Sequence, residues 1–128
     1  MSEILYPTKF VIEPIKITSG DVVIPAVLND TVAAKDFQGR LPFRVTGNDS
    51  GIDYCCVAKE GKSDPDERQN GWKNGDINLA GGWFALLYGG EETSEAYTDM
   101  MIIGHIKKEH LETLKKLPNA ATFLVELA

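Results

Sequence analysis

Residues 83–88 read Trp83-Phe84-Ala85-Leu86-Leu87-Tyr88, an unbroken run of six apolar or aromatic side chains. Successive side chains of a strand point to opposite faces of the sheet, so a strand without polar residues has no face suited to water. The glycine pairs at 81–82 and 89–90 bracket the run and indicate turns. We therefore expect all six side chains to be covered on both sides, as in a closed β-barrel with a helix or loop outside it.

Other apolar stretches mark further strands on both sides of this run. Residues 9–18, interrupted by Pro14, and residues 22–28 flank the turn residues 19–21 and predict a hairpin, with a bulge or an edge at the proline. Residues 41–46 and 52–56 flank a turn at 47–51 and predict a second hairpin. The remaining candidates are residues 75–80, 82–88, 100–106 and 121–127. Together these stretches provide eight strand candidates.

Two short helices are predicted between the strands. Asn29 and Asp30 can cap a helix over residues 31–38, and Gly39 can end it. Its buried face is expected to hold Val32, Ala33 and Phe37. A second helix is indicated by Leu111, Leu114 and Leu117, and it ends at Pro118. We expect an all-β protein: a closed barrel of about eight strands whose ends are plugged by two short helices.

Length and charge limit the classes of protein to be considered. With 128 residues the chain is expected to form one domain, residues 1–128. Apolar residues make up 43% and charged residues 25%, and no apolar run approaches the length of a membrane helix. The net charge of −6 arises from 13 basic and 19 acidic residues without a concentrated basic face. We therefore expect neither a nucleic-acid partner nor a membrane partner.

The cysteines and the first residues bear on the compartment. Cys55 and Cys56 are neighbours, and neighbouring strand residues point to opposite faces, so we expect two free thiols. Residues 1–9 lack the basic start and apolar core of a signal peptide. Both features predict a cytoplasmic protein.

The order of several segments is similar to that of the cyclophilins, and more so to uncharacterised bacterial cyclophilin-like domains. The resemblance runs from about Val27 to the C-terminus. The segments that carry it are residues 29–37 leading to Leu41-Pro42, Trp72 with Gly75-Asp76-Ile77, residues 84–89, and Ile103-Gly104-His105-Ile106 before a helix at 109–117. The resemblance implies a cyclophilin-like barrel.

The resemblance also suggests a catalytic residue. Cyclophilins isomerise bonds that precede proline, and an arginine on a barrel strand donates a hydrogen bond to the prolyl nitrogen. Arg44 in residues 41–46 stands at the matching position. The downstream Gln-Gly-Gly-Asp pattern is missing, and the segment Gly82-Trp83-Phe84-Ala85-Leu86 lacks the family's glutamine. These departures disfavour isomerase activity and favour a binding domain.

The proposed binding site is a surface groove beside the strand of Arg44, flanked by the loops at 59–71 and 89–99. Both loops are polar and long, which is typical of functional or mobile segments. The groove is expected to be lined by Phe43, Arg44, Trp72, Tyr88 and Tyr97. Its occupant would be a peptide or a small molecule.

Metal and cofactor sites are not indicated. His105 and His110 have no cysteine at metal-binding spacing, and a zinc site needs three or four convergent ligands. The acidic residues in the loop at 89–99 lack the ordered pattern of a calcium loop. No nucleotide-binding glycine motif is present. We expect no metal and no cofactor.

Three functions therefore remain open: a domain that binds a peptide or small ligand, a weak peptidyl-prolyl isomerase that uses Arg44, and a module for self-association into a homo-oligomer.

Overall fold

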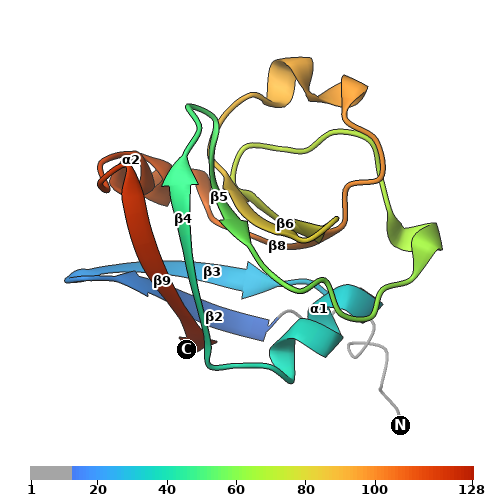
Figure 1. Ribbon diagram of the computed structural model, residues 1–128, viewed down its shortest axis with the longest axis horizontal. Coiled ribbons are helices and arrows are strands. Elements are labelled where there is room, and N and C mark those ends of the chain that lie inside the picture. The colour runs from blue at the N-terminus through green and yellow to red at the C-terminus, as the bar shows by residue number, and fades with distance from the viewer. Residues whose placement is uncertain (1–12) are drawn as a thin grey trace, which may run out of the picture.

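Eight antiparallel strands close into a barrel in the computed structural model, which describes residues 13–128 (Figure 1). The strands are β2 (Glu13–Ser19), β3 (Val22–Leu28), β4 (Phe43–Asp49), β5 (Asp53–Val57), β6 (Asp76–Ala80), β7 (Trp83–Leu87), β8 (Ile102–His105) and β9 (Ala120–Leu127). Their order around the barrel is β2-β3-β8-β6-β7-β5-β4-β9. The last strand, β9, pairs with both β4 and β2, and this closes the barrel. The predicted all-β barrel with short helices is confirmed.

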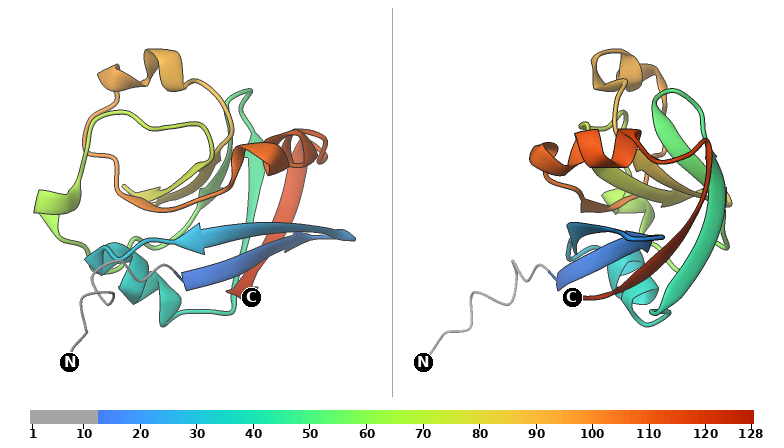
Figure 2. Two further views of the ribbon diagram at one scale, coloured as in Figure 1. Left: turned by 180° about the vertical axis from the view of Figure 1, so that it is seen from behind. Right: turned by 90° about the vertical axis from the view of Figure 1, so that its left-hand side faces the viewer.

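The two α-helices are α1 (Val32–Gln38) and α2 (Leu111–Lys115), and they lie at opposite ends of the barrel (Figures 1 and 2). Residues 13–128 also contain three short 3₁₀ turns: η2 (Pro65–Glu67), η3 (Glu91–Ala96) and η4 (Lys108–His110). Phe37 of α1 packs edge-on against Phe43 and stacks on Phe84, which plugs one end. Leu111 and Leu114 of α2 belong to the same core cluster at the other end. Among the described residues, no helix combines the length and the apolar character that a membrane crossing requires.

The start of α1 differs from the prediction by one residue. Thr31, rather than Asn29 or Asp30, is the N-cap, and its hydroxyl accepts the Ala34 N–H at 3.1 Å. Asn29 supports the cap, since its side-chain oxygen accepts the N–H of Thr31. Ala34 is buried with Ala33 and Phe37, whereas Val32, the first residue of the helix, was expected to be buried and is 42% exposed.

Residues 83–88 form β7 and its exit, and five of the six side chains are buried as predicted. Phe84 and Leu86 face the barrel interior, whereas Ala85 and Leu87 face outward and pack in a second cluster with Trp72. The expectation is wrong for Trp83, which is 48% exposed. Trp83 begins the strand and lies opposite Val57, which is 74% exposed, so this end of the strand pair has no cover.

The second hairpin is tighter than predicted. Strand β4 continues through Gly47 to Asp49, and the turn occupies only residues 50–52. Gly47 is buried in the strand, and a side chain there would collide with Cys55 and Cys56 on β5. Pro14 lies in an uninterrupted β2–β3 register, so it does not form a bulge, and its carbonyl accepts the Ala128 N–H at 3.2 Å beyond the last residue pair of β2 and β9. The part of the first predicted strand at 9–12 lies outside the described residues.

Candidate functional site

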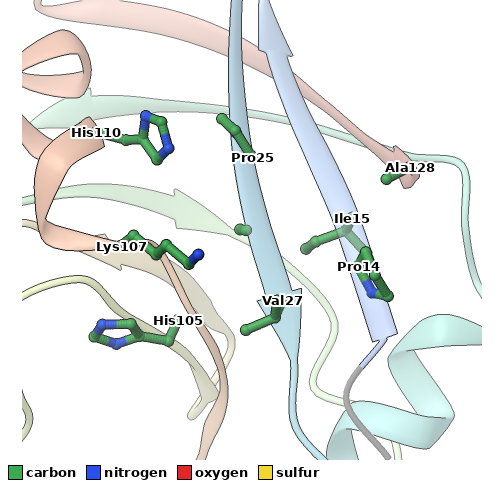
Figure 3. A pocket seen from close by; sticks show the side chains of 9 residues that line it. Pro14, Ile15, Pro25, Val27, His105, Lys107, His110 and Ala128 are labelled. Carbon is green, nitrogen blue, oxygen red and sulfur yellow. The ribbon is translucent and has the colours of Figure 1, made fainter.

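Two adjoining cavities lie on the outside of the barrel where β3 meets β8. Their volumes are about 320 Å³ and about 210 Å³. Both are lined by Val27 and His105, so they form one depression, which we call the His105 groove. Figure 3 shows the larger cavity, with β2 and β3 on one side and the segment that follows β8 on the other.

The groove exists because β3 and β8 separate after only two residue pairs. Val27 lies opposite His105, and Leu28 lies opposite Gly104. Pro25, the next residue whose backbone points toward β8, has no N–H, so the ladder cannot continue. After His105 the chain stays with the neighbouring strand, since the Ile106 N–H donates to the Gly75 carbonyl at 2.7 Å. The space between the diverging segments is the cavity.

Side chains from four strands form a row across this outer face. Pro14 of β2 lies opposite Val27 of β3, Val27 lies opposite His105 of β8, and His105 lies opposite Asp76 of β6. Pro25 and Val27 supply apolar wall on β3, with Pro14 beyond them (Figure 3). The row thus runs from an apolar surface to a histidine backed by a carboxylate.

The Asp76–His105 pair is held on both sides. The His105 Nδ1 atom lies 2.8 Å from Asp76 Oδ1, and Asp76 Oδ2 accepts the Lys73 N–H at 2.8 Å. Asp76 is 7% exposed, whereas the His105 side chain is 41% exposed. Gly75, at a φ of 107°, leaves room for the imidazole, because a Cβ there would lie 2.9 Å from the ring carbon Cε1. The ring is therefore oriented by the protein, with Nδ1 held by Asp76.

Two more basic side chains continue the wall that carries His105. Lys107 precedes the turn η4, and His110 ends it. In Figure 3 both lie on the same side of the cavity as His105, opposite Pro25 and Val27. His110 has one acidic neighbour, the exposed Glu109, at 3.9 Å. The His105 groove therefore combines an apolar wall with a basic one.

Comparison with known proteins places this architecture in a family. The model of the cyclophilin-like family matches residues 17–126, which is most of the chain. The chain belongs to the cyclophilin-like family. No curated protein matches it significantly.

The solution structure of the hypothetical protein AF2241 from Archaeoglobus fulgidus has a similar fold. The TM-score is 0.66 at 18% sequence identity, and the match covers 93% of this chain and 97% of that one. At this identity the similarity concerns the fold alone.

The residues that the sequence analysis proposed for a groove are distributed over different faces of this cyclophilin-like barrel. Arg44 is exposed on the outer face of β4, opposite Leu124. Phe43, its neighbour in the chain, points the other way and packs on Phe37 and Phe84. Because adjacent strand residues face opposite sides, Phe43 and Arg44 do not line a common surface.

Trp72 and Tyr97 are brought together, with ring centroids 5.2 Å apart. Trp72 is only 6% exposed, and its indole N–H donates to the Gly89 carbonyl at 2.8 Å. Its ring packs on the outer side of β7 and β8 through Ala85, Leu87 and Ile102. The two long loops are joined here, since the Trp72 N–H donates to the Ser94 hydroxyl at 3.0 Å. Trp72 thus covers the sheet, while Tyr97 is 54% exposed.

Tyr88 lies in a third place, against a polar cavity of about 370 Å³ beside α2. Its hydroxyl donates to Asp49 at 2.5 Å, and the Lys115 ammonium lies 5.9 Å from its ring centroid. Burial and the hydrogen bond to Asp49 raise the pKa of Tyr88 well above its usual range. The hydroxyl therefore remains protonated at any physiological pH.

The groove around His105 and His110 was not predicted from the sequence, where the two histidines were weighed only as metal ligands. Within residues 13–128, no three histidine, cysteine or acidic side chains are grouped as a metal site would require. The available signal was Pro25 inside an otherwise β-branched strand, which marks a place where pairing must stop. The partner strand, and with it the Asp76–His105 pair, could not be read from the sequence because it depends on the register.

Proposed function

We propose that this cyclophilin-like domain is a binding module that takes a small organic ligand in the His105 groove. One observation carries the proposal: the apolar wall of β2 and β3 leads directly to His105, whose Nδ1 is held by Asp76 at 2.8 Å. Ligand sites in proteins combine a mostly apolar lining with a few oriented polar groups. The ring of His105 is such a group, because its orientation is set before any ligand arrives.

The size of the groove favours a small molecule over a folded partner. The larger cavity, at about 320 Å³, falls at the lower end of the range typical of small-molecule sites. The adjoining space of about 210 Å³ extends the site toward Asn29 and Ile102. A short apolar ligand, or the end of a peptide, fits these dimensions.

The proposal is tested by a small-molecule fragment screen that monitors backbone amide shifts by NMR. Ligands are expected to shift the amides of Val27, Gly104 and His105. The variant Val27→Glu places a charge on the apolar wall and should abolish these responses. Val23→Glu is the matched control: Val23 lies on the same face of β3, is 55% exposed and does not line the groove. Ligand shifts that persist in Val27→Glu, or a screen without any response at the groove, would overturn the proposal.

Prolyl isomerisation through Arg44 is the second candidate function. The observation in its favour is that Arg44 projects from the outer face of β4 and is exposed, so its guanidinium can reach a peptide. Isomerisation of a proline-containing peptide, followed by NMR exchange, tests it. Acceleration that disappears in Arg44→Ala but survives in Lys35→Ala, an exposed cation on α1, supports this function. A rate equal to the uncatalysed one removes it.

A further inference from the structure

The larger cavity of the His105 groove is lined by a cation and by no acidic side chain, although the protein as a whole is acidic. The chain carries a net charge of −6. The residues that line the larger cavity include Lys107, His105 and His110 and no acidic residue. A local positive site on an acidic protein attracts anions that the rest of the surface repels.

The nearest carboxylate lies in the smaller cavity and not in the larger one. Asp76 lines the smaller cavity, yet both of its oxygens are engaged, one by His105 Nδ1 and the other by the Lys73 N–H. Glu109 is exposed and lies beside His110 at 3.9 Å, outside the lining of either cavity. The cationic group that lines the larger cavity is therefore the Lys107 ammonium.

The geometry separates the two kinds of contact. Figure 3 shows Lys107 between His110 and His105, with its amine directed toward β3. Pro25 and Val27 lie across the cavity from it, and Pro14 and Ile15 lie beyond them on β2 (Figure 3). A ligand that satisfies both walls must have an anionic end and an apolar body.

The number of permanent cations favours a singly charged anion. Lys107 is the one lysine or arginine among the residues that line the larger cavity. A phosphate dianion would bring more charge and more acceptor atoms than this wall can match, whereas a carboxylate carries the single charge that one ammonium matches.

We propose, on the basis of the binding function proposed above, that the ligand class of the His105 groove is a monocarboxylate with a compact apolar body. Its carboxylate binds the Lys107 ammonium. Its apolar part lies along Pro25 and Val27.

Three probes that share an eight-carbon alkyl chain test the ligand class: octanoate, octanol and octylamine. Each is titrated against the full-length ¹⁵N-labelled protein and followed by NMR. Octanoate is expected to bind in the groove at least ten-fold more tightly than octanol, and octylamine more weakly still. Lys107→Gln should weaken octanoate binding roughly ten-fold or more and leave octanol unchanged. Lys108→Gln is the matched control, since Lys108 is the next residue but lines the polar cavity beside α2 instead.

The outcomes separate this inference from the proposed function. If octanoate and octanol bind the groove equally well and Lys107→Gln does not change this, the proposed carboxylate ligand class is overturned. The proposed binding function is then unaffected. Octanoate binding that persists in Val27→Glu contradicts both, because the site then lies elsewhere. If none of the three probes binds, the carboxylate is overturned, and the fragment screen decides the binding function. A native amide spectrum for each variant shows that the fold is intact.

Discussion

The Nδ1 atom of His105 lies 2.8 Å from Oδ1 of Asp76, on adjacent strands of the barrel. An ionised carboxylate can only accept hydrogen bonds. Neutral His105 is therefore expected to carry its proton on Nδ1, with Nε2 as an acceptor. Long-range ¹H–¹⁵N correlation spectra at a pH where the ring is neutral measure this tautomer directly.

The variant Asp76→Asn should reverse that tautomer. The amide oxygen of asparagine would keep the Lys73 N–H, which leaves the NH₂ group facing Nδ1. His105 would then be protonated on Nε2. If the native protein already shows the Nε2–H tautomer, or if Asp76→Asn changes nothing, the pair does not orient the ring.

Cys56 is expected to resist alkylation in the folded protein. Its side chain is fully buried, and burial raises the pKa of its thiol to about 12, with smaller contributions from Cys55 and Asp53. Since only the thiolate reacts, iodoacetamide at pH 8 should modify Cys55 first and Cys56 only after unfolding. Peptide mass spectrometry at successive time points measures the alkylation of each cysteine separately. In Cys55→Ser only the slow alkylation of Cys56 remains. Rapid labelling of Cys56 in the native state would contradict its burial.

The same thiol predicts how stability responds to alkaline pH. The folded protein retains the Cys56 proton where the unfolded chain, with a thiol pKa of about 8.5, has lost it. The free energy of unfolding should therefore fall as the pH rises from about 8.5 to about 12. Urea denaturation at several pH values measures the slope, which should be smaller in Cys56→Val.

Gly104→Ala is expected to destabilise the barrel by about 1–3 kcal/mol. Gly104 lies between Leu28 and Ile77 in adjacent strands, and a Cβ there would collide with the Val27 carbonyl oxygen. Only two residue pairs join β3 to β8, so this seam has little tolerance for displacement. Gly89→Ala is the control, because its Cβ would have 4.0 Å to the nearest atom. Equal unfolding midpoints for the two variants would show that the seam can adjust.

Tyr54→Phe should cost about 1 kcal/mol of stability. The ring of Tyr54 is buried, and its hydroxyl donates to the carbonyls of Leu117 and Pro118, at 2.7 Å and 2.9 Å. These hydrogen bonds connect β5 to the segment between α2 and β9. Removal of the hydroxyl leaves those carbonyls without this donor. The exposed Tyr97 provides the comparison, since Tyr97→Phe should leave the urea midpoint unchanged. If Tyr54→Phe leaves the free energy of unfolding unchanged, water replaces the hydroxyl as the donor.

Strand and helix positions could be predicted from the sequence because their signals are local. Residues 22–28 were predicted as a strand and form β3 with those bounds, and Gly39 ends α1 as expected. The opposite faces predicted for Cys55 and Cys56 are also observed, since Cys56 is fully buried in the core and Cys55 is half-buried. A two-residue period is a property of neighbouring residues, so it needs no knowledge of the rest of the chain.

The contacts between residues of different strands and loops were decided only in the tertiary structure. Asp76 and His105 are 29 residues apart and meet because β6 and β8 pair in one particular register. The exposure of Trp83 and the burial of Trp72 likewise depend on where the two long loops pack, which no local pattern specifies. The sequence by itself determined an eight-stranded barrel with two capping helices, because hydrophobic periodicity selects the elements and their inner faces. The register and the loop packing decided which outer side chains share a surface, because those contacts join residues that are distant in the chain.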